Sequence, residues 1–475
     1  MTADDVVTGI RVNAKTVEPV APWTHTVLEP ATGKARAELV GGAEAEARQA
    51  LEAASVALPG WSETAVPRRA AALRAVAAQL RDDAVAEPLA VLISKETGKR
   101  IAEARAEVGL SATFFEWFAD AISVRAESRL EVVPGLHHEI TEHALGVVAV
   151  LSPWNFPLSI PARKIAPALA AGCTVLFRPS EVAPSSALWL AELVEQQVPA
   201  GTINTAVGDP TTVSDTWLAD RRVRGLTFTG STRVGRLLAS ATADAFTRCV
   251  LELGGNAPFV VLDDASLDRA VQLLMVAKYR NNGQSCIAAN QVWVPRARLD
   301  DFAEAFRAAS ENLVLGDPLD ESTTLGPLAL PGDPARVDEL AGSGGDVVRA
   351  DVAVPRQGHF ARPAISVGPG PDSRVAREEI FGPAVSVHGY DSVDDVVSTV
   401  REGQYGLGGY VVGDPDRANR VARALDVGIV GVNTGSPNHP RVPFAGLKDS
   451  GIGVEGGYGG LEAFLTSQTI AVSDR

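Results

Sequence analysis

Phe228-Thr229-Gly230-Ser231-Thr232-Arg233-Val234-Gly235 has the pattern of a strand that ends in a tight turn and continues directly as a helix. Gly230 allows a ligand to approach the backbone closely, and Ser231 with the free N–H groups of the helix start offers donors to a phosphate. An ordinary capped helix has the same local pattern, so the turn alone does not identify a phosphate site. Its strand-to-helix order indicates one unit of a largely parallel α/β sheet.

The same alternation of strands and helices extends to both sides of this turn. We expect strands at residues 146–151, 174–177, 225–228, 291–294 and 384–388. We expect helices at residues 162–171, 185–196, 268–280 and 299–313, and several amphipathic helices within 43–127, interrupted near Pro59-Gly60 and Pro67. Residues 321–371 are rich in glycine and proline and predict loops with short strands. The sequence therefore predicts an α/β protein.

Composition bounds the size of the protein and excludes several classes. A chain of 475 residues predicts about two to four domains. Its 43 basic and 58 acidic residues give a net charge of -15, which argues against nucleic-acid binding. No apolar stretch approaches the roughly 18 residues that cross a bilayer, and the acidic residues 1–5 have no signal-peptide pattern. Three cysteines cannot form a disulfide framework or a structural zinc site, so we expect a cytoplasmic protein.

Two motifs that suggest a cofactor or a metal ion lie in an unsuitable context. Gly451-Ile452-Gly453-Val454-Glu455-Gly456 has the glycine spacing of a dinucleotide-binding loop, but no strand-helix-strand unit follows it. His138 and His143 are five residues apart, whereas the zinc-binding helix of metalloproteases places its histidines four apart. We therefore expect no metal site, and we interpret residues 137–143 as a solvated hairpin strand.

Three residues have the chemical type and the setting of catalytic groups. Cys286 follows a polar, glycine-containing turn, which suits an accessible nucleophile, although most lone cysteines are core fillers, as we expect for Cys173 and Cys249. Glu252 lies inside an apolar strand, where burial would raise its pKa toward that of a general base; the alternative is a strand-end side chain in solvent. Asn155 lies in a turn bounded by two prolines, as a rigidly held amide donor or simply as part of a stiff turn.

Taken together and in their order, these segments resemble the aldehyde dehydrogenase superfamily over nearly the whole chain. The matching segments are the Trp154-Asn155 turn, Phe177-Arg178-Pro179-Ser180-Glu181, residues 228–235, Glu252-Leu253-Gly254-Gly255, Cys286, Glu378-Glu379-Ile380-Phe381-Gly382-Pro383 and Pro443-Phe444-Ala445-Gly446. The resemblance implies a Rossmann-like cofactor domain of residues 1–121 and 142–251 and an α/β catalytic domain of residues 252–441. It also implies a small β arm for oligomerisation, residues 122–141 and 442–475, and hence a homodimer or homotetramer.

The resemblance further implies NAD(P)-dependent oxidation of an aldehyde to a carboxylic acid through a thioester. Cys286 would attack the carbonyl carbon, and the Asn155 amide with the Cys286 backbone N–H would bind the oxyanion. After hydride transfer, Glu252 would activate the water that hydrolyses the acyl-enzyme. A CoA-acylating enzyme has no need of such a base, and a non-catalytic NAD-binding protein has no need of the nucleophile.

The cofactor contacts carried over from the family are Trp154, Arg178, Glu181, Gly230, Ser231, Leu253, Glu379 and Phe381. The Glu181 carboxylate would bind the hydroxyls of the adenosine ribose and repel a 2′-phosphate, which favours NAD. Arg178, where the family usually has lysine, could instead attract that phosphate, so NADP stays possible.

Arg163 and Arg280 indicate the class of substrate. Either arginine alone would more often be a surface or helix-capping charge. As a pair they resemble the succinate-semialdehyde dehydrogenase branch, in which arginines at these positions bind the distal carboxylate of the substrate. Asn438 stands where that branch usually has a carboxylate-binding serine. The expected substrate is succinate semialdehyde, and the alternative is a neutral aliphatic or aromatic aldehyde.

Overall fold

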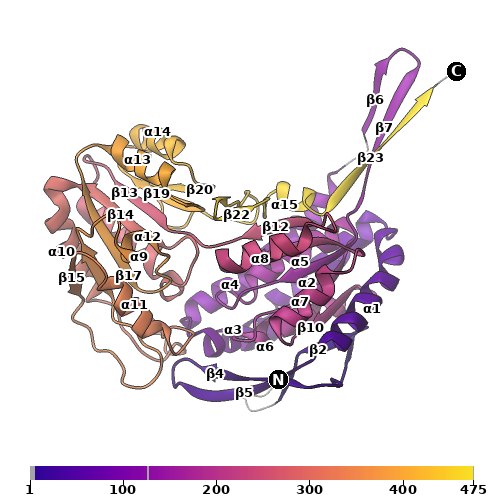
Figure 1. Cartoon of the computed structure of the whole chain (residues 1–475), viewed down its shortest axis with the longest axis horizontal. Helices are drawn as coiled ribbons and strands as arrows, with labels where there is room; N and C mark the ends of the chain where they lie inside the picture. Colours follow the sequence, from indigo (N-terminus) through magenta and orange to yellow (C-terminus); the bar gives the residue numbers. More distant parts are fainter. Residues whose placement is uncertain (1–5, 126–127, 474–475) are drawn as a thin grey trace.

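The computed structural model describes residues 6–125 and 128–473; residues 1–5, on which the signal-peptide prediction rests, lie outside the described part. Two mainly parallel sheets lie side by side, each covered by helices, and a slender arm projects from the first half (Figure 1). This arrangement confirms the predicted α/β class. None of the helices in the described part of the chain combines the length and the apolarity that a bilayer crossing requires.

The first sheet has eight strands in the order β22-β12-β11-β8-β9-β10-β2-β3. Its five middle strands are parallel, and β22, β2 and β3 run antiparallel to their neighbours. The bounds are β2 Ile10–Val12, β3 Lys15–Thr16, β8 Val147–Leu151, β9 Thr174–Arg178, β10 Ile203–Ala206, β11 Val223–Thr229, β12 Arg248–Glu252 and β22 Gly451–Ile452. Strand β8 is buried along its whole length because both faces are covered, which explains its continuous apolar sequence.

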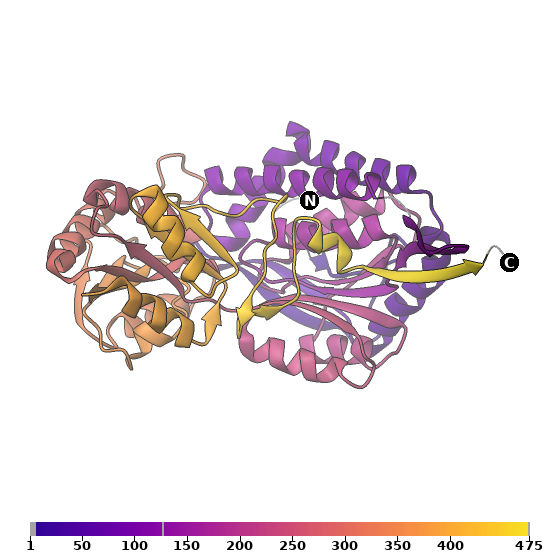
Figure 2. The same cartoon turned by 90° about the horizontal axis from the view of Figure 1, so that it is seen from above.

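Helices cover both faces of this sheet (Figure 2). They are α1 Glu44–Ser62, α2 Val66–Arg81, α3 Asp83–Thr97, α4 Ile101–Ser123, α5 Ser159–Ala171, α6 Pro184–Glu195, α7 Pro210–Leu218 and α8 Thr232–Thr242. Contrary to prediction, Pro59 does not interrupt α1, because it lies in the last turn, where its missing N–H removes a single helical hydrogen bond. Pro67 does mark a boundary, since it occupies the first turn of α2 and loses no helical bond there.

The second sheet has seven strands in the order β15-β16-β17-β14-β13-β19-β20, parallel except for β15. Its strands are β13 Ala257–Val261, β14 Ala289–Pro295, β15 Asp346–Arg349, β16 Ala364–Val367, β17 Ala384–Tyr390, β19 Gly408–Val412 and β20 Ile429–Val432, and its longer helices are α9 Leu267–Tyr279, α10 Leu299–Ser310, α11 Asp333–Ala341, α13 Val393–Glu402 and α14 Pro415–Ala424. Helix α11 was missed in the region predicted as loops. Its buried Val337 packs with Ile380, but a helix of nine residues among glycines and prolines shows too little periodicity to be recognised.

The remaining elements were not among those predicted from the sequence. They are the three-stranded sheet of β1 Val7–Thr8, β4 Trp23–Glu29 and β5 Lys34–Gly41, the pair of β18 Tyr405–Gly406 and β21 Leu447–Lys448, and the short helices η1 Arg280–Gly283, η2 Arg296–Arg298, α12 Arg374–Arg377 and α15 Gly459–Glu462. Strands β4 and β5 form a hairpin beneath the first sheet in the view of Figure 1.

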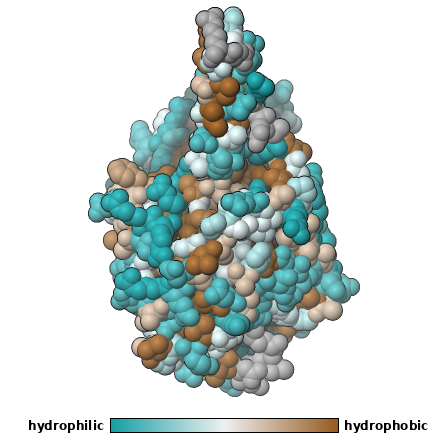
Figure 3. Space-filling view, turned by 90° about the vertical axis from the view of Figure 1, so that its right-hand side faces the viewer, coloured by the Kyte–Doolittle hydropathy of each residue, from teal (hydrophilic) through white to brown (hydrophobic). Residues whose placement is uncertain are grey.

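The projecting arm is a three-stranded antiparallel sheet, and Figure 3 shows it standing above the body of the molecule. Its strands are β6 Ser128–Val133, β7 Leu136–Ala144 and β23 Leu465–Ser473, with β7 in the middle. This confirms the hairpin strand predicted for residues 137–143. Residues 442–464 do not belong to the arm sheet, because β22 pairs with β12 of the first sheet and α15 contacts α5.

Close backbone packing joins the half of the protein that contains the first sheet to the half that contains the second sheet. The contact lies next to the loop that precedes Cys286. A Cβ added to Gly326 would lie 1.9 Å from the carbonyl oxygen of Gly98, the residue that ends α3 in a left-handed conformation (φ 75°). The Asn282 side chain donates to the carbonyls of Gly98 and Pro327 (3.1 and 2.9 Å) and accepts from the Gly326 N–H (2.8 Å). Asn282 therefore ties its own loop to both halves of the protein.

Replacing Gly326 by alanine should destabilise the fold. The new Cβ would collide with a backbone carbonyl that cannot move without breaking the hydrogen bonds of Asn282, and overpacking of this kind costs about 1–3 kcal/mol. We expect a lower midpoint of thermal unfolding in calorimetry. Gly370→Ala is the matched control, because nothing lies within 4 Å of its added Cβ. Equal midpoints for the two variants would contradict the tight packing at Gly326.

Candidate active site

Four neighbouring parallel strands end at the same edge of the first sheet. The register pairs Leu151 of β8 with Arg178 of β9 and with Phe228 of β11, and it pairs Thr229 of β11 with Glu252 of β12. Ligands of open α/β sheets bind at such carboxyl ends. Eight of the predicted site residues lie at these ends or within four residues of them: Trp154, Asn155, Arg178, Glu181, Gly230, Ser231, Glu252 and Leu253.

The loop after β8 brings Asn155 to the loop that carries Cys286. Asn155 is 4% exposed, and its Nδ2 donates to the carbonyl of Gln284 over 3.0 Å. An amide nitrogen carries two hydrogens, so the second stays available for an oxyanion. The predicted oxyanion donor therefore contacts the chain two residues before the predicted nucleophile.

Cys286 lies beyond α9 and η1, with a half-buried side chain that packs beside Phe444. Its backbone is pressed against the chain that enters the second sheet, since a Cβ on Gly255 would lie 2.2 Å from the Cys286 carbonyl oxygen. Burial and the carboxylate of Glu379 raise the pKa of Cys286 to about 12, while Arg163 acts in the opposite direction. The resting group is therefore a thiol, and its attack on a carbonyl requires loss of a proton.

The other two cysteines lie away from these strand ends. Cys173 is fully buried, as predicted for a core filler, and burial raises its pKa to about 11. Cys249 packs against the core of the first half but is only half-buried, near the start of β12, with its Sγ 3.1 Å from Thr242 Oγ1.

Glu252 ends β12 as a buried carboxyl group. It is 1% exposed, and within the described part of the chain neither of its oxygens has a hydrogen-bond partner. The pKa of Glu252 is raised well above its usual value, mainly by burial and secondly by the charge of Glu455. Arg163 and Lys164 act in the opposite direction. This confirms the burial expected from the apolar strand and excludes the solvent-facing alternative.

Glu455 belongs to this site, although the sequence analysis did not select it. It forms ion pairs with Lys164 and with Arg163 (Nε to Oε2, 2.6 Å), and it accepts a hydrogen bond from Thr227 Oγ1 over 3.2 Å. Burial opposes its ionisation, but the two cations outweigh burial and hold the pKa of Glu455 below its usual value. The available signal was Arg163-Lys164 within an otherwise apolar helical run, because buried cations require a counterion.

The residues predicted to contact the adenosine and phosphate groups follow β9 and β11. Arg178 Nη2 donates to Glu181 Oε2 over 3.0 Å, so the arginine and the carboxylate form a pair. Ser231 caps α8 by accepting from the Val234 N–H over 3.4 Å. A Cβ on Gly230 would lie 2.4 Å from the ring of Phe228, so a larger residue in this turn would require the Phe228 ring to move. The predicted strand, turn and helix of this segment are thus confirmed.

The residues predicted near the nicotinamide ribose come from the second half of the chain. Glu379 Oε1 accepts from the Gly255 N–H over 3.2 Å, and burial raises the pKa of Glu379 to about 7. The rings of Phe381 and Trp154 meet edge to face, with their centroids 5.6 Å apart. These contacts bring the Glu379-Phe381 segment against the strand ends of the first sheet.

Unpartnered polar atoms lie along the same sheet edge. Ser152 Oγ, Arg178 Nε, Thr229 Oγ1 and both Glu252 oxygens are buried, and within the described residues none has a hydrogen-bond partner. Most buried polar groups in proteins have a partner, so this row fits a polar ligand that lies across the strand ends. An arginine, two hydroxyl groups and a helix N-terminus are donors that suit a dinucleotide.

The three residues predicted to bind substrate lie together. Arg280 Nη1 donates to Asn438 Oδ1 over 3.2 Å, and Asn438 lines a small cavity with Arg163 and Phe444. The Arg163 guanidinium lies 4.5 Å from the centre of the Phe444 ring, which also packs beside Cys286. Two arginines from distant segments therefore lie near Asn438, and Arg163 also lies near Phe444.

Comparison with known proteins gives a consistent family. Residues 18–470 match the aldehyde dehydrogenase family. The chain is 37% identical over 460 residues to a glutarate-semialdehyde dehydrogenase of Pseudomonas putida, covering 95% of this chain and 94% of that protein. It is 38% identical over 454 residues to the NADP⁺ succinate-semialdehyde dehydrogenase of Escherichia coli, covering 92% of each. The crystal structure of a succinate-semialdehyde dehydrogenase from Burkholderia pseudomallei has a TM-score of 0.94 at 36% identity and covers 98% of both chains.

A match of this length decides between the alternatives that the residues left open. The protein is an enzyme, an NAD(P)-dependent oxidoreductase that acts on an aldehyde, rather than a non-catalytic NAD-binding protein. The chain belongs to the aldehyde dehydrogenase family.

Proposed function

We propose that this enzyme oxidises a short aldehyde with a distal carboxylate, and that succinate semialdehyde is its substrate. The observation that carries the proposal is the contact of Arg280 with Asn438, which lines the same cavity as Arg163. In a chain of net charge -15, an anionic substrate needs local cations, and these arginines supply them near Asn438. The relatives named for succinate and glutarate semialdehyde support the same class of substrate.

Catalysis begins with bond formation between the Cys286 sulfur and the aldehyde carbon. Because burial keeps the group as a thiol, attack on the carbonyl is coupled to release of its proton to solvent. The carbonyl oxygen becomes negative in this step. The free hydrogen of the Asn155 amide and the backbone N–H of Cys286 are the donors assigned to it.

Bound NAD(P)⁺ supplies the acceptor for the hydride that the tetrahedral carbon releases. The adenosine and phosphate groups of the cofactor would be held by Arg178, Glu181, Gly230, Ser231 and Leu253. Its nicotinamide ribose would be held by Trp154, Glu379 and Phe381. The carbon then forms a thioester with Cys286. Glu252 takes a proton from water, the water oxygen bonds to the thioester carbon, and the carboxylic acid leaves as Glu252 passes that proton to the departing sulfur of Cys286. A carboxyl group with a raised pKa is suited to accept a proton near neutral pH.

Glu252→Gln should trap the acyl-enzyme. Without the base, thioester hydrolysis is expected to slow by about 10²–10⁴-fold, while the sulfur can still attack. Intact-mass spectrometry after incubation with NAD⁺ and succinate semialdehyde should show an added succinyl group on this variant. Cys286→Ala should carry none, and a wild-type rate of turnover with no adduct in Glu252→Gln would remove the assigned role of Glu252.

Replacing Arg280 by methionine tests the carboxylate contact. Loss of a charge-assisted hydrogen bond costs about 1.5–3 kcal/mol, so we expect KM for succinate semialdehyde to rise roughly 10–100-fold. The neutral butanal is the matched substrate, and its KM should change less than threefold. Arg163→Met should behave similarly, with an additional loss of kcat because Arg163 also pairs with Glu455. Equal effects on both aldehydes would favour the neutral-aldehyde alternative.

We further propose that the enzyme prefers NAD to NADP. The support is the Arg178–Glu181 pair, in which the carboxylate compensates the arginine that could otherwise attract a 2′-phosphate. The side chain of Glu181 is about one quarter exposed, so it remains open to the ribose hydroxyls that a carboxylate binds.

Glu181→Ala should shift the preference toward NADP. The change removes the repulsion of the 2′-phosphate and frees Arg178, so the ratio of kcat/KM for NAD to that for NADP should fall at least tenfold. Glu192→Ala is the matched control, since it removes a partly exposed carboxylate on α6 that pairs with Arg11 instead. A ratio that stays at the wild-type value in Glu181→Ala would contradict the assignment.

We also propose that the protein forms a homodimer or a homotetramer through the arm. Its exposed apolar side chains are Leu130, Val132, Val133, Ile470 and Val472. Within the described part of the chain, β7 is the one strand that pairs with β23, whose other edge is open to strand addition by a second copy. We also propose a division of the chain into a cofactor domain, a catalytic domain and an arm, with residues 128–144 and 465–473 forming the arm sheet. A nucleophilic thiol also suits a reducing cytoplasm.

A further inference from the structure

The turn of residues 155–159, between β8 and α5, is held by a buried ion pair that the reaction described above does not use. Lys99 follows α3 and Glu107 lies on α4; both side chains are almost fully buried, and they form an ion pair. Lys99 Nζ also donates to the Asn155 carbonyl over 3.1 Å and lies 4.1 Å from the centre of the Phe156 ring. The ammonium group therefore contacts the first two residues of the turn.

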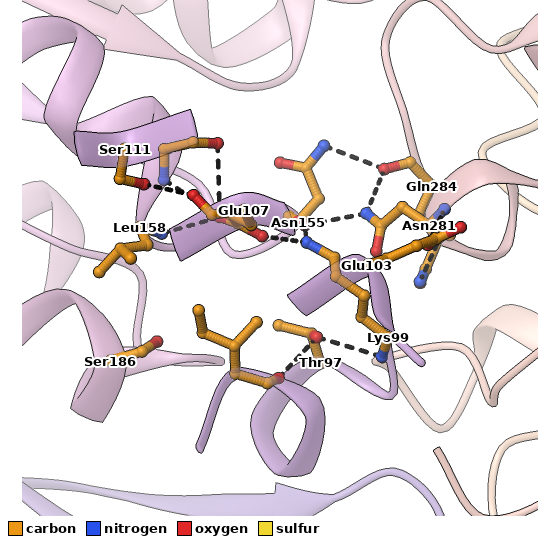
Figure 4. A network of polar contacts seen from close by, with 12 residues as sticks. Thr97, Lys99, Glu103, Glu107, Ser111, Asn155, Leu158, Ser186, Asn281 and Gln284 are labelled. Carbon is orange, nitrogen blue, oxygen red and sulfur yellow. Dashed lines mark hydrogen bonds and ion pairs between the residues drawn. The ribbon is translucent and has the colours of Figure 1, made fainter. Parts of the chain in front are cut away.

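Glu107 holds the other end of the same turn (Figure 4). Its Oε1 accepts from the backbone N–H groups of Leu158 and Ser159 over 3.0 and 3.1 Å. These groups lie at the start of α5, where a carboxylate satisfies free donors and interacts favourably with the helix dipole. One ion pair thus fixes both ends of a turn of five residues.

Asn281 connects this turn to the loop that carries the nucleophile. Its Nδ2 donates to the carbonyl of Asn155 over 2.8 Å and to the carbonyl of Gln284 over 3.0 Å. Its backbone N–H donates to Glu103 Oε2 over 2.8 Å, and its φ of 52° is a left-handed conformation that asparagine adopts more readily than most residues. Because the Asn155 amide donates to the same Gln284 carbonyl, that amide is oriented through its own backbone and through its acceptor.

We propose that Lys99, Glu107 and Asn281 form an oxyanion clamp, a set of positioning residues that holds the Asn155 amide ready for the oxyanion. A donor stabilises developing charge only if it is in place beforehand, and a misplacement of about 1 Å can cost ~10²-fold in rate. A buried ion pair rarely adds net stability, so a positional role accounts for its presence. The proposal rests on the proposed function only in taking Asn155 as the oxyanion donor.

Asn281→Gly removes one member of the oxyanion clamp without straining the backbone, because glycine adopts the left-handed conformation freely. The measurement is hydride formation in a single turnover, followed by the nicotinamide absorbance with succinate semialdehyde and with butanal. We expect the rate constant to fall roughly 10–100-fold with both aldehydes, while the dissociation constant for NAD⁺ stays within twofold of wild type. A wild-type rate constant would overturn the proposal.

A double-mutant cycle with Asn155→Ala separates positioning from general structural damage. Loss of an oxyanion donor costs about 10²–10³-fold. If the oxyanion clamp acts through Asn155, then adding Asn281→Gly should change the rate of the Asn155→Ala enzyme less than threefold. If the losses in rate of Asn155→Ala and Asn281→Gly instead multiply in the double variant, the proposal is overturned. The pair Lys99→Met with Glu107→Gln removes both charges together and should show the same non-additivity, which keeps the test decisive if Asn281→Gly folds poorly.

Glu96→Gln is the matched control for Glu107→Gln. Glu96 is also a buried carboxylate at a helix start, where it accepts from the N–H groups of Ser185 and Ser186 over 2.8 and 3.0 Å. We expect its hydride rate to stay within twofold of wild type, and a loss equal to that of Glu107→Gln would overturn the proposal in favour of helix capping. If the wild-type enzyme prefers butanal to succinate semialdehyde, the proposal of a substrate with a distal carboxylate is wrong. The oxyanion clamp can still be tested in that case, because the double-mutant cycle can be measured with butanal.

Discussion

Parallel strands that end in register impose the arrangement on which the rest of this site depends. Because β9, β8, β11 and β12 run in the same direction, the chain must leave all four at one edge of the sheet. Six of the eight residues assigned to the cofactor lie at these strand ends or in the loops that follow them: Trp154, Arg178, Glu181, Gly230, Ser231 and Leu253. At β12 the chain crosses into the second sheet through Gly254-Gly255, and Gly255 lies directly against the Cys286 carbonyl. The crossing therefore brings the nucleophile to the same edge as the oxyanion donor and the base.

Buried charged side chains position α5, the helix that follows the turn of residues 155–159. Glu107 binds the first N–H groups of α5, and Glu455 pairs with Arg163 and Lys164 one turn further along the same helix. Such pairs contribute little net stability, but removing one partner leaves an uncompensated charge in the interior, so the geometry is strongly specified. Glu455 also raises the pKa of Glu252. The charges that position the helix thus act, together with burial, on the proton affinity of the proposed base.

Short-range signals account for the parts of the fold and the site that could be predicted. The alternation of apolar strands and helices marks β8, β9, β11 and β14, because burial on both faces selects apolar residues locally. Cys286, Asn155 and Glu252 stand out since each places a reactive group beside glycine, proline or apolar neighbours. Helix α11 was missed, because its nine residues show little periodicity. The β4–β5 hairpin was missed although Lys34-Ala35-Arg36-Ala37-Glu38-Leu39 alternates charged and apolar residues, which is the pattern of a half-buried strand.

The sequence by itself determined the types of chemistry available: a thiol, a carboxyl group and an amide, each in a local setting that suits its assigned role. Only the tertiary structure decided which charges meet. Lys164 and Glu455 are 291 residues apart, and Asn281 contacts a carbonyl 126 residues away. Burial, pKa and hydrogen-bond geometry depend on distances between such remote residues, and those distances are set by strand register and by the crossing between sheets. No local pattern contains them, which is why Glu455 and the oxyanion clamp became visible only in the folded chain.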